Sequence, residues 1–296
     1  MHGGVVAYVS FLLVLLVSFY LGARLQRRNR FATQTAKRET PMHSLHIYKP
    51  GLVPLAPQHA SVAIVGCARD VAKFLPKMRE VISRVRSLFG RSRVCIYEND
   101  SRDSTLSILQ SWEKSGFSHV ISERKTPGGR TGRLAHGRNI LMRWALRAED
   151  SPPSYVIVMD LDNVNTKLKK EAVKRCFTVT GNWGMLGANQ TRRYYDLWAL
   201  RTFDDWMPFD CWACAHAKGK QAQHYCVGSR FRSIAPTSPI IEVVSCFGGF
   251  ALYKSEYMLG PHHPLYVGVG CEHVSFNRAI RLNGGAIAIA PFLLNS

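Results

Sequence analysis

The sequence is poor in acidic side chains. Asp and Glu together number 20 in 296 residues, against 39 Lys and Arg, so the formal net charge is +19 at pH 7. Such a charge suits an anionic partner: a nucleic acid, a membrane surface, a phosphorylated ligand or an acidic glycan. The sequence also lacks an RNA-binding signature, zinc-finger spacing and leucine-zipper heptads, so we expect no nucleic-acid partner.

Internal repeats are missing as well, which argues against a solenoid or other repeat array. Hydrophobic residues make up 46% of the chain, a composition unlike that of a disordered protein. This is enough for one sizeable core, so we expect one folded domain with an appendage.

Charge is absent from residues 5–23, "VVAYVSFLLVLLVSFYLGA". A helix of this length spans about 28 Å, close to the hydrocarbon core of a bilayer. A basic segment before the run and a clear small-residue cleavage site after it are both missing, which disfavours a cleaved signal peptide. We therefore predict a retained single-pass membrane anchor over residues 1–23.

The charges on either side of this apolar run indicate on which side of the membrane the body would lie. Arg24, Arg27, Arg28 and Arg30 follow the run, whereas only His2 and the amino terminus precede it. The positive-inside tendency would keep the body in the cytosol. Residues 24–60 are basic, then rich in Pro and His, and show no periodicity, so they predict a stem before a folded body over 61–296.

The eight cysteines are compatible with three interpretations. Cys211 and Cys214 form a C-x-x-C, with His216, His224 and Cys226 nearby. A second C-x-x-C, which many zinc sites have, is missing. The pattern is compatible with a zinc site, a disulfide or reduced thiols.

Residues 61–160 alternate between short apolar runs and segments with helical spacing. This alternation predicts an α/β domain with a mainly parallel sheet. The expected strands are "SVAIVGCA", "RVCIYEND", "HVISER" and "YVIVMD", and the expected helices lie within 71–90, 103–116 and 132–150.

Polar side chains follow three of these strands, and ligands of such sheets bind beyond the carboxyl ends of the strands. We therefore expect one crevice there. The residues concerned are Arg69 and Asp70, then Glu98, Asn99 and Asp100, then Asp160 and Asp162.

Asp160 and Asp162 form a D-x-D in "YVIVMDLDNVN". Two carboxylates at a strand end make a hard oxygen site for Mg²⁺ or Mn²⁺, and such a metal can bridge a diphosphate. The alternative structural role is a helix cap or a surface turn. The pattern also resembles loosely that of haloacid-dehalogenase-like phosphatases, but there the motif usually opens the domain, and Asp204 and Asp205 end no obvious strand.

Residues 61–165 resemble the family 2-like nucleotide-sugar glycosyltransferases of GT-A fold in order and spacing. The resemblance rests on "SVAIVGCARD", "VCIYENDSRDSTLSIL", "GRLAHGRNILMRWA" and "YVIVMDLDN". A looser resemblance, through "YENDSRDST", "YYDLWALR" and "CFGGFALYK", links the chain to the fungal capsular α-1,3-mannosyltransferase group.

This resemblance implies a membrane-anchored, Mn²⁺- or Mg²⁺-dependent hexosyltransferase. Its donor would be a nucleotide-diphosphate sugar, with mannose as one option, and its acceptor a glycan or glycoprotein. Placement in the Golgi or ER is implied too, whereas the basic flank points to the cytosol. The alternative functions are that of the phosphatase and that of a GT-A-like protein that binds a nucleotide or polyanion without turnover.

The resemblance also implies roles for residues in the first half of the domain. Arg138 would face the diphosphate, Asp160 would contact ribose or metal, and Asp162 would bind the metal. The nucleoside would be held by Ala68, Arg69, Glu98, Asn99 and Asp100, where Glu98 and Asn99 replace the usual pair of Asp residues.

In the second half, the aromatic-rich segments after residue 170 would complete the sheet and form an acceptor-facing wall. Gly248 and Gly249 would allow close backbone approach to a sugar, or else form a tight turn. Glu272 is the first candidate for general base, with Asp196 second, and His273 would be a third metal ligand. The structural alternative for Glu272 is a carboxylate at a helix start.

Overall fold

The computed structural model describes residues 46–147, 151–218 and 220–296. The predicted anchor, 1–23, and the predicted stem as far as residue 45 lie outside the described residues. Among the residues described, no helix is long and apolar enough to cross a membrane.

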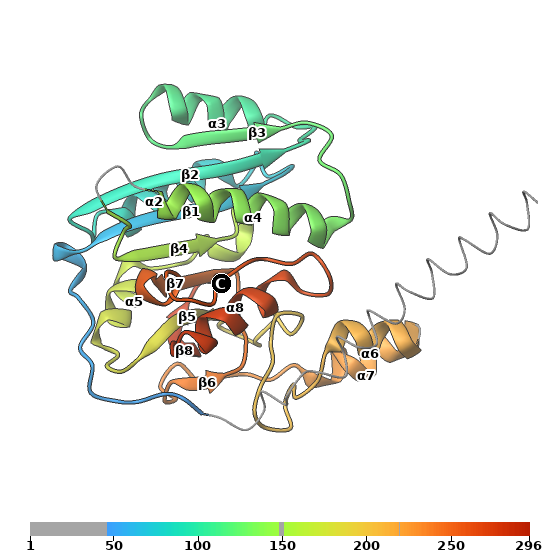
Figure 1. The fold of residues 1–296 in the computed structure, drawn as a ribbon. Coiled ribbons are helices and arrows are strands. Elements are labelled where there is room, and N and C mark those ends of the chain that lie inside the picture. Colours follow the sequence, from blue (N-terminus) through green and yellow to red (C-terminus); the bar gives the residue numbers. More distant parts are fainter. Residues whose placement is uncertain (1–45, 148–150, 219) are drawn as a thin grey trace, which may run out of the picture. The chain divides into compact units, whose positions relative to one another are not determined.

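One mixed sheet forms the centre of the body (Figure 1). Its strands are β1 (Ser61–Ala68), β2 (Arg91–Asn99), β3 (His119–Glu123), β4 (Tyr155–Met159), β5 (Trp183–Asn189), β6 (Ile241–Val243), β7 (Phe250–Lys254) and β8 (Ala286–Leu294). Their order is β3-β2-β1-β4-β7-β5-β8-β6. The first four in this order are parallel, β7 is antiparallel to both neighbours, β8 is parallel to β5, and β6 is antiparallel to β8.

Helices cover both faces of the sheet, because successive strand residues point to opposite sides. Ala63 and Val65 pack with α4 and α8, whereas Val62 and Ile64 pack with α2, α3 and α5. The mixed α/β sheet with flanking helices fits the GT-A class that the sequence predicts. The helices are α2 (Leu75–Arg86), α3 (Thr105–Lys114), α4 (Arg130–Leu146), α5 (Lys170–Arg175), α6 (Cys211–Lys218), α7 (Lys220–Cys226) and α8 (Glu272–Leu282).

The end of the predicted stem belongs to the body. The Ile47 amide donates to the Glu242 carboxylate at 2.9 Å, and the carbonyl of Leu52 accepts from the Gly181 amide at 2.6 Å. The described end of the predicted stem therefore packs on the domain that the sequence places at 61–296. These contacts are made largely by backbone groups, which leave no hydrophobic periodicity in the sequence.

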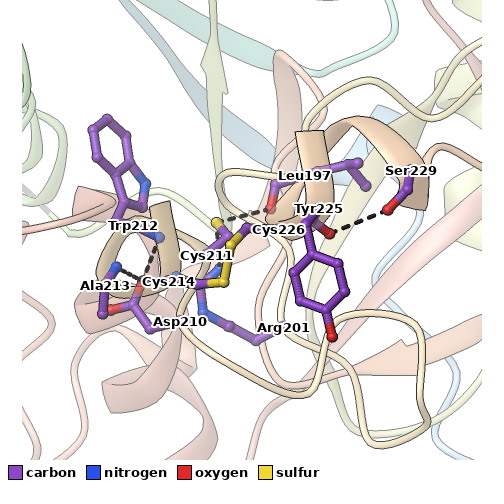
Figure 2. Close-up of a disulfide and its surroundings, with 10 residues drawn as sticks. All are labelled: Leu197, Arg201, Asp210, Cys211, Trp212, Ala213, Cys214, Tyr225, Cys226 and Ser229. Atoms are coloured by element: carbon purple, nitrogen blue, oxygen red, sulfur yellow. Dashed lines mark hydrogen bonds and ion pairs between the residues drawn. A yellow bond between two sulfur atoms is a disulfide. The ribbon is translucent and has the colours of Figure 1, made fainter. Parts of the chain in front are cut away.

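A disulfide between Cys214 and Cys226 joins α6 to α7, with the two Cα atoms 6.0 Å apart (Figure 2). Cys211 is buried and free, and its thiol donates to the carbonyls of Leu197 and Trp198. Of the three interpretations of the C-x-x-C, the structure shows a disulfide. It joins Cys214 of the motif to Cys226 and not to Cys211. In the part of the chain that the structure describes, no three His, Cys, Asp or Glu side chains form a group that could hold a metal.

This disulfide predicts an alkylation pattern, because a sulfur in a disulfide does not react with iodoacetamide. In denaturant without reductant, we expect six of the eight cysteines to be modified, and all eight after reduction. Mass spectrometry of the non-reduced digest should recover a peptide pair that links Cys214 to Cys226. Modification of all eight without reductant would contradict the assignment.

Candidate active site

A cavity of about 560 Å³ lies at the carboxyl ends of β1, β2 and β4, where the sequence predicts the crevice. Its volume lies within the range of small-molecule sites. The cavity brings together residues that are far apart in the chain. The predicted site residues among its lining are Ala68, Arg69, Asn99, Arg138, Asp160, Asp162, Asp196, Glu272 and His273.

Arg138 connects two of the acids. Its side chain projects from α4 and is 4% exposed. One guanidinium nitrogen donates to Asp160 Oδ1 at 3.2 Å, and another donates to the Glu272 carboxylate in a close ion pair. The guanidinium also lies 5.2 Å from the centre of the Phe247 ring. Although burial alone disfavours the cation, Glu272 and Asp160 raise the pKa of Arg138, which stays charged.

The predicted role of Arg138 therefore changes. A free guanidinium would face the diphosphate, but this one is committed to two carboxylates of the protein. It offsets their negative charge and holds the buried Glu272 and the partly exposed Asp160 in fixed positions.

Gly248 and Gly249 position two acids through their backbone. Both have positive φ angles, +72° and +80°. The Gly248 amide donates to Asp196 Oδ2 at 2.9 Å, and the Gly249 carbonyl accepts from the Asp160 amide at 2.9 Å. A Cβ at Gly248 would lie 2.3 Å from the Ala188 carbonyl oxygen, so no other residue fits there.

These two glycines are not among the residues that line the cavity. Of the two predicted roles of these glycines, a tight turn fits their positions better than close backbone approach to a sugar. Their contribution to the site is to hold Asp160 and Asp196, which do line it.

The acids at this end of the sheet have altered affinities for protons. Burial raises the pKa of Asp160 to about 7; Arg138 opposes the shift, and Asp162, Asp196 and Glu272 add to it. Burial also raises the pKa of Asp196, with a smaller contribution from Glu272, while the bond from Gly248 acts the other way. Clustered acids with raised pKa values in a cavity are typical of functional sites.

Asp160 and Asp162 fit a divalent cation as two oxygen ligands. Both line the cavity, and Asp162 also accepts the Val164 amide at 3.0 Å, which fixes the turn after β4. Sites for Mg²⁺ and Mn²⁺ commonly use one or two carboxylates, with substrate phosphates and water as the other ligands. Two protein carboxylates are therefore sufficient if a diphosphate supplies the rest.

His273 is not arranged as the predicted third ligand. The ring is 3% exposed and stacks on Phe247 with ring centres 3.9 Å apart. Neither ring nitrogen has a hydrogen-bond partner in the described part of the chain. Burial, aided by the nearby Arg138, lowers the pKa of His273 well below its usual value, so the ring is neutral. It lies in the lining of the cavity without joining Asp160 and Asp162 in a three-ligand group.

The predicted nucleoside residues separate into two sets. Ala68, Arg69 and Asn99 line the cavity. Glu98 instead accepts from the Ser101 amide at 2.9 Å and from the Ser122 hydroxyl at 2.6 Å.

Asp100, at a φ of +54°, accepts from the amides of Lys125 and Thr126. These backbone bonds, that of Lys125 first, lower the pKa of Asp100. Glu98 and Asp100 thus hold the loops around the site and are not among its lining residues.

Several lining residues were not predicted. Arg130 and Arg133, in the first turn of α4, form no ion pair among the described residues, and both line the cavity. They follow "PGG" and lie on either side of residue 132, where the expected helix begins, and a cation at a helix start after glycines is a sequence signal for an anion site. Trp212, which lies between the two cysteines of the C-x-x-C, also lines the cavity.

No family model matches the chain, and no curated protein matches it in sequence. Among solved structures it is similar to the mannosyltransferase PcManGT from Pyrobaculum calidifontis in complex with GDP-Man and Mn²⁺, with 14% identity and a TM-score of 0.47 over 93% of this chain and 66% of that one. It is also similar to S. aureus TarS, with 11% identity and a TM-score of 0.47 over 77% of this chain and 35% of that one.

A third similar structure is glucosyl-3-phosphoglycerate synthase from Mycobacterium tuberculosis in complex with Mn²⁺, UDP and phosphoglyceric acid. It shares 14% identity and has a TM-score of 0.43, over 81% of this chain and 73% of that one. The chain spans less than two thirds of the length of the first two proteins. Activity and substrate therefore have to be inferred from the residues of the site.

Proposed function

We propose that the protein is a divalent-metal-dependent glycosyltransferase that uses a nucleotide-diphosphate sugar. The observation that carries the proposal is the cavity at the carboxyl ends of β1, β2 and β4. It combines the two acids of the D-x-D, a further acid at Asp196, and two cations, Arg130 and Arg133, that form no ion pair with any residue the structure describes. This is the set of charges that transfer from a sugar diphosphate requires.

Asp160 and Asp162 would hold Mn²⁺ or Mg²⁺. When bound, the metal neutralises charge on the departing diphosphate. Arg130 and Arg133 are better placed than Arg138 to contact that diphosphate, because the Arg138 guanidinium is bound to Asp160 and Glu272. The amino-terminal end of α4, where both lie, also favours an anion through its free amides and its dipole.

Asp196 is the better candidate for general base, which reverses the ranking from the sequence. The Glu272 carboxylate is already bound to Arg138, whereas Asp196 accepts from the Gly248 amide and pairs with no cation among the described residues. A base works best when its pKa lies near the working pH, and the pKa of Asp196 is raised towards that range. Glu272 then serves to hold Arg138.

The phosphatase alternative gains no support from its second acid pair. Asp204 and Asp205 lie in a loop, where Asp204 accepts the Trp206 amide at 3.0 Å, and neither lines the cavity. The non-catalytic alternative makes a different prediction, which is nucleotide binding without release of a product.

We further propose that the donor sugar is mannose and that the acceptor is a glycan or glycoprotein, as the resemblance implies. Residues 1–23 anchor the protein in a Golgi or ER membrane with the body in the lumen. The Cys214–Cys226 disulfide supports the lumenal side, because disulfides persist in oxidising compartments.

The anchor can be tested by deletion. Since Ile47 and Leu52 already bond to the body, removal of residues 1–44 should keep these contacts and release a folded, soluble body from the membrane fraction. Membrane association of the truncated body would contradict the anchor, and protease sensitivity of the carboxyl terminus in intact vesicles would contradict the lumenal placement.

The raised pKa of Asp160 predicts a pH dependence of metal binding. The metal needs the ionised carboxylate, so a proton competes with it as the pH falls through about 7. With that pKa about one Asp160 in ten is ionised at pH 6 and most are at pH 8, so Mn²⁺ affinity should be about tenfold lower at pH 6.

Calorimetric titration of Mn²⁺ at both pH values checks this, and Asp160→Asn should bind weakly with little pH dependence. Equal affinity of the wild type at both pH values would contradict the assignment of Asp160 as a ligand.

The proposed activity is tested by a donor screen. Purified body, Mn²⁺ and a panel of UDP- and GDP-sugars are incubated with a mixed glycan acceptor, and the release of nucleoside diphosphate is measured. We expect one donor to give release that EDTA abolishes. Hydrolysis of simple phosphomonoesters without any nucleoside diphosphate release would favour the phosphatase instead.

A further inference from the structure

The segment before α8 carries a row of exposed apolar side chains. Leu265, Val267 and Val269 are 55%, 42% and 85% exposed. Tyr266, between the first two, is 2% exposed and stacks on Phe276 of α8 with ring centres 4.1 Å apart. The segment therefore packs on the helix through Tyr266, and its three aliphatic side chains point outward. Exposed apolar groups that gather in one place are typical of an interaction surface.

Hydrogen bonds hold the backbone of this segment in place. The Ser275 hydroxyl donates to the carbonyl of Leu265 and accepts from the amide of Val267, each at 3.0 Å. The Asn139 side chain, on α4, accepts from the Tyr266 amide at 2.9 Å and donates to its carbonyl at 2.8 Å. The row of aliphatic side chains thus stands on a fixed support and is not the product of a loose loop.

The same segment forms part of the rim of the cavity. The Gly268 carbonyl accepts from the Thr131 hydroxyl at 3.0 Å, and a Cβ on Gly268 would lie 2.5 Å from the Cα of Gly132. The segment therefore touches the first turn of α4. Residues on either side of this contact line the cavity, namely Arg130, Arg133, Cys271 and Glu272.

The charge around the apolar row has one sign. No Asp or Glu occurs in residues 124–147 or in residues 257–271. Arg124 and Lys125, in the connection from β3 to α4, are exposed and form no ion pair with any residue that the structure describes. Figure 1 shows this connection and the loop before α8 at the same edge of the body. Aliphatic side chains beside unpaired cations fit the surface of a phospholipid bilayer, where the former enter between the headgroups and the latter meet lipid phosphates.

The rest of the chain favours a bilayer over a protein partner. The proposed anchor would keep the body at a membrane, because residues 24–45, even fully extended, span at most about 75 Å. A tether of this length makes the bilayer a surface of high effective concentration, so that even a weak contact is populated.

We propose that Leu265, Val267 and Val269 dock the body on a phospholipid bilayer, with Arg124 and Lys125 against lipid phosphates. The inference goes beyond the proposed anchor, because it gives the body a contact of its own with the membrane. It places the rim of the cavity at the lipid headgroups. Such a position favours an acceptor that is itself attached to the membrane.

The test measures contact with lipid and needs no turnover. The full chain is placed in lipid nanodiscs of phosphatidylcholine, with or without added phosphatidylserine. A fluorescent amino acid replaces Val269 in one sample and Leu282 in another, and quenching by nitroxide-labelled lipid is recorded. Leu282 is the matched control, because it is 50% exposed and lies at the other end of α8.

We expect strong quenching at position 269 and weak quenching at position 282. With the label at 269, Leu265→Asp should remove most of the quenching, whereas Leu282→Asp should leave it unchanged. Arg124→Gln together with Lys125→Gln should lower the docking equilibrium on phosphatidylserine discs by about tenfold or more, since each cation near an anionic surface contributes about fivefold. Thermal midpoints check that each variant is folded.

Equal quenching at the two positions, or quenching at 269 that Leu265→Asp leaves unchanged, would overturn the inference. It would also be overturned if lipid did not quench the label at 269 and the label became shielded from aqueous iodide as the protein concentration rose, because the row would then bind a second copy of the chain.

The proposals made above are tested separately on the same protein. If the chain does not insert into nanodiscs, the proposed anchor fails, and quenching at the two positions by vesicles of the same lipids decides whether the body docks by itself. Calorimetry of UDP and GDP with Mn²⁺ reports on the proposed transferase site, and its outcome does not depend on lipid contact.

Discussion

Replacement of Asp162 by Ala is expected to abolish sugar transfer, with a loss of more than about a thousandfold in kcat/KM, as the cation-dependent neutralisation of the diphosphate is lost. Asp162 follows β4 directly, lines the cavity and lies next to Asp160 at the proposed metal site. Donor affinity in the presence of Mn²⁺ should fall as well, because metal and diphosphate bind together.

Asp162 also has a structural role, so the alanine variant alone is ambiguous. Its carboxylate caps the short turn at Asn163–Asn165 through the Val164 amide. Asp162→Asn is the matched variant, since the amide oxygen can accept the same bond while the charge is lost. If the charge matters, both variants are inactive; if Asp162→Asn transfers sugar at the wild-type rate, Asp162 is only a cap and the metal assignment is wrong.

The second large effect is expected at Asp196. Asp196→Asn keeps the shape and the bond from the Gly248 amide, and loses only the capacity to accept a proton. Loss of a general base commonly costs about 10²- to 10⁴-fold in rate. We therefore expect kcat to fall by that amount, with donor affinity within about threefold of the wild type.

Glu272→Gln provides the comparison. Because Glu272 is bound to Arg138, the substitution leaves Arg138 with Asp160 as its single charged partner and should disturb the metal end of the site. The expected signature is a weaker affinity for Mn²⁺ and donor, together with a lower thermal midpoint.

A large loss of kcat in Glu272→Gln at unchanged donor affinity would return the role of base to Glu272. Near-normal turnover of both variants would point to a retaining mechanism in which the donor phosphate takes the acceptor proton.

The first half of the fold could be predicted because its signals are local. The apolar runs that become β1, β2 and β4 stand between segments with helical spacing, and polar residues follow each run. The rule that ligands bind at carboxyl ends of parallel strands then gave the position of the cavity. Asp160, Asp162 and Asn99, which lie at the ends of these strands, line that cavity.

The remaining features depend on contacts between distant parts of the chain. Arg138 and Glu272 are 134 residues apart, and no local pattern shows that they form an ion pair. Gly248 and Asp196 are 52 residues apart and meet because β7 is inserted between β4 and β5. Likewise, the C-x-x-C favoured no particular partner for Cys214, and only the packing of α6 on α7 selects Cys226.

We propose that this cavity binds a nucleotide-diphosphate sugar through a metal held by Asp160 and Asp162. Calorimetric titration of UDP- and GDP-sugars into the body, with Mn²⁺ and again with EDTA, measures this binding. We expect one nucleotide sugar to bind with Mn²⁺, and this binding to be lost in EDTA and in Asp162→Asn. Equal binding with Mn²⁺ and EDTA, or no binding of any nucleotide sugar to the folded wild type, would contradict it.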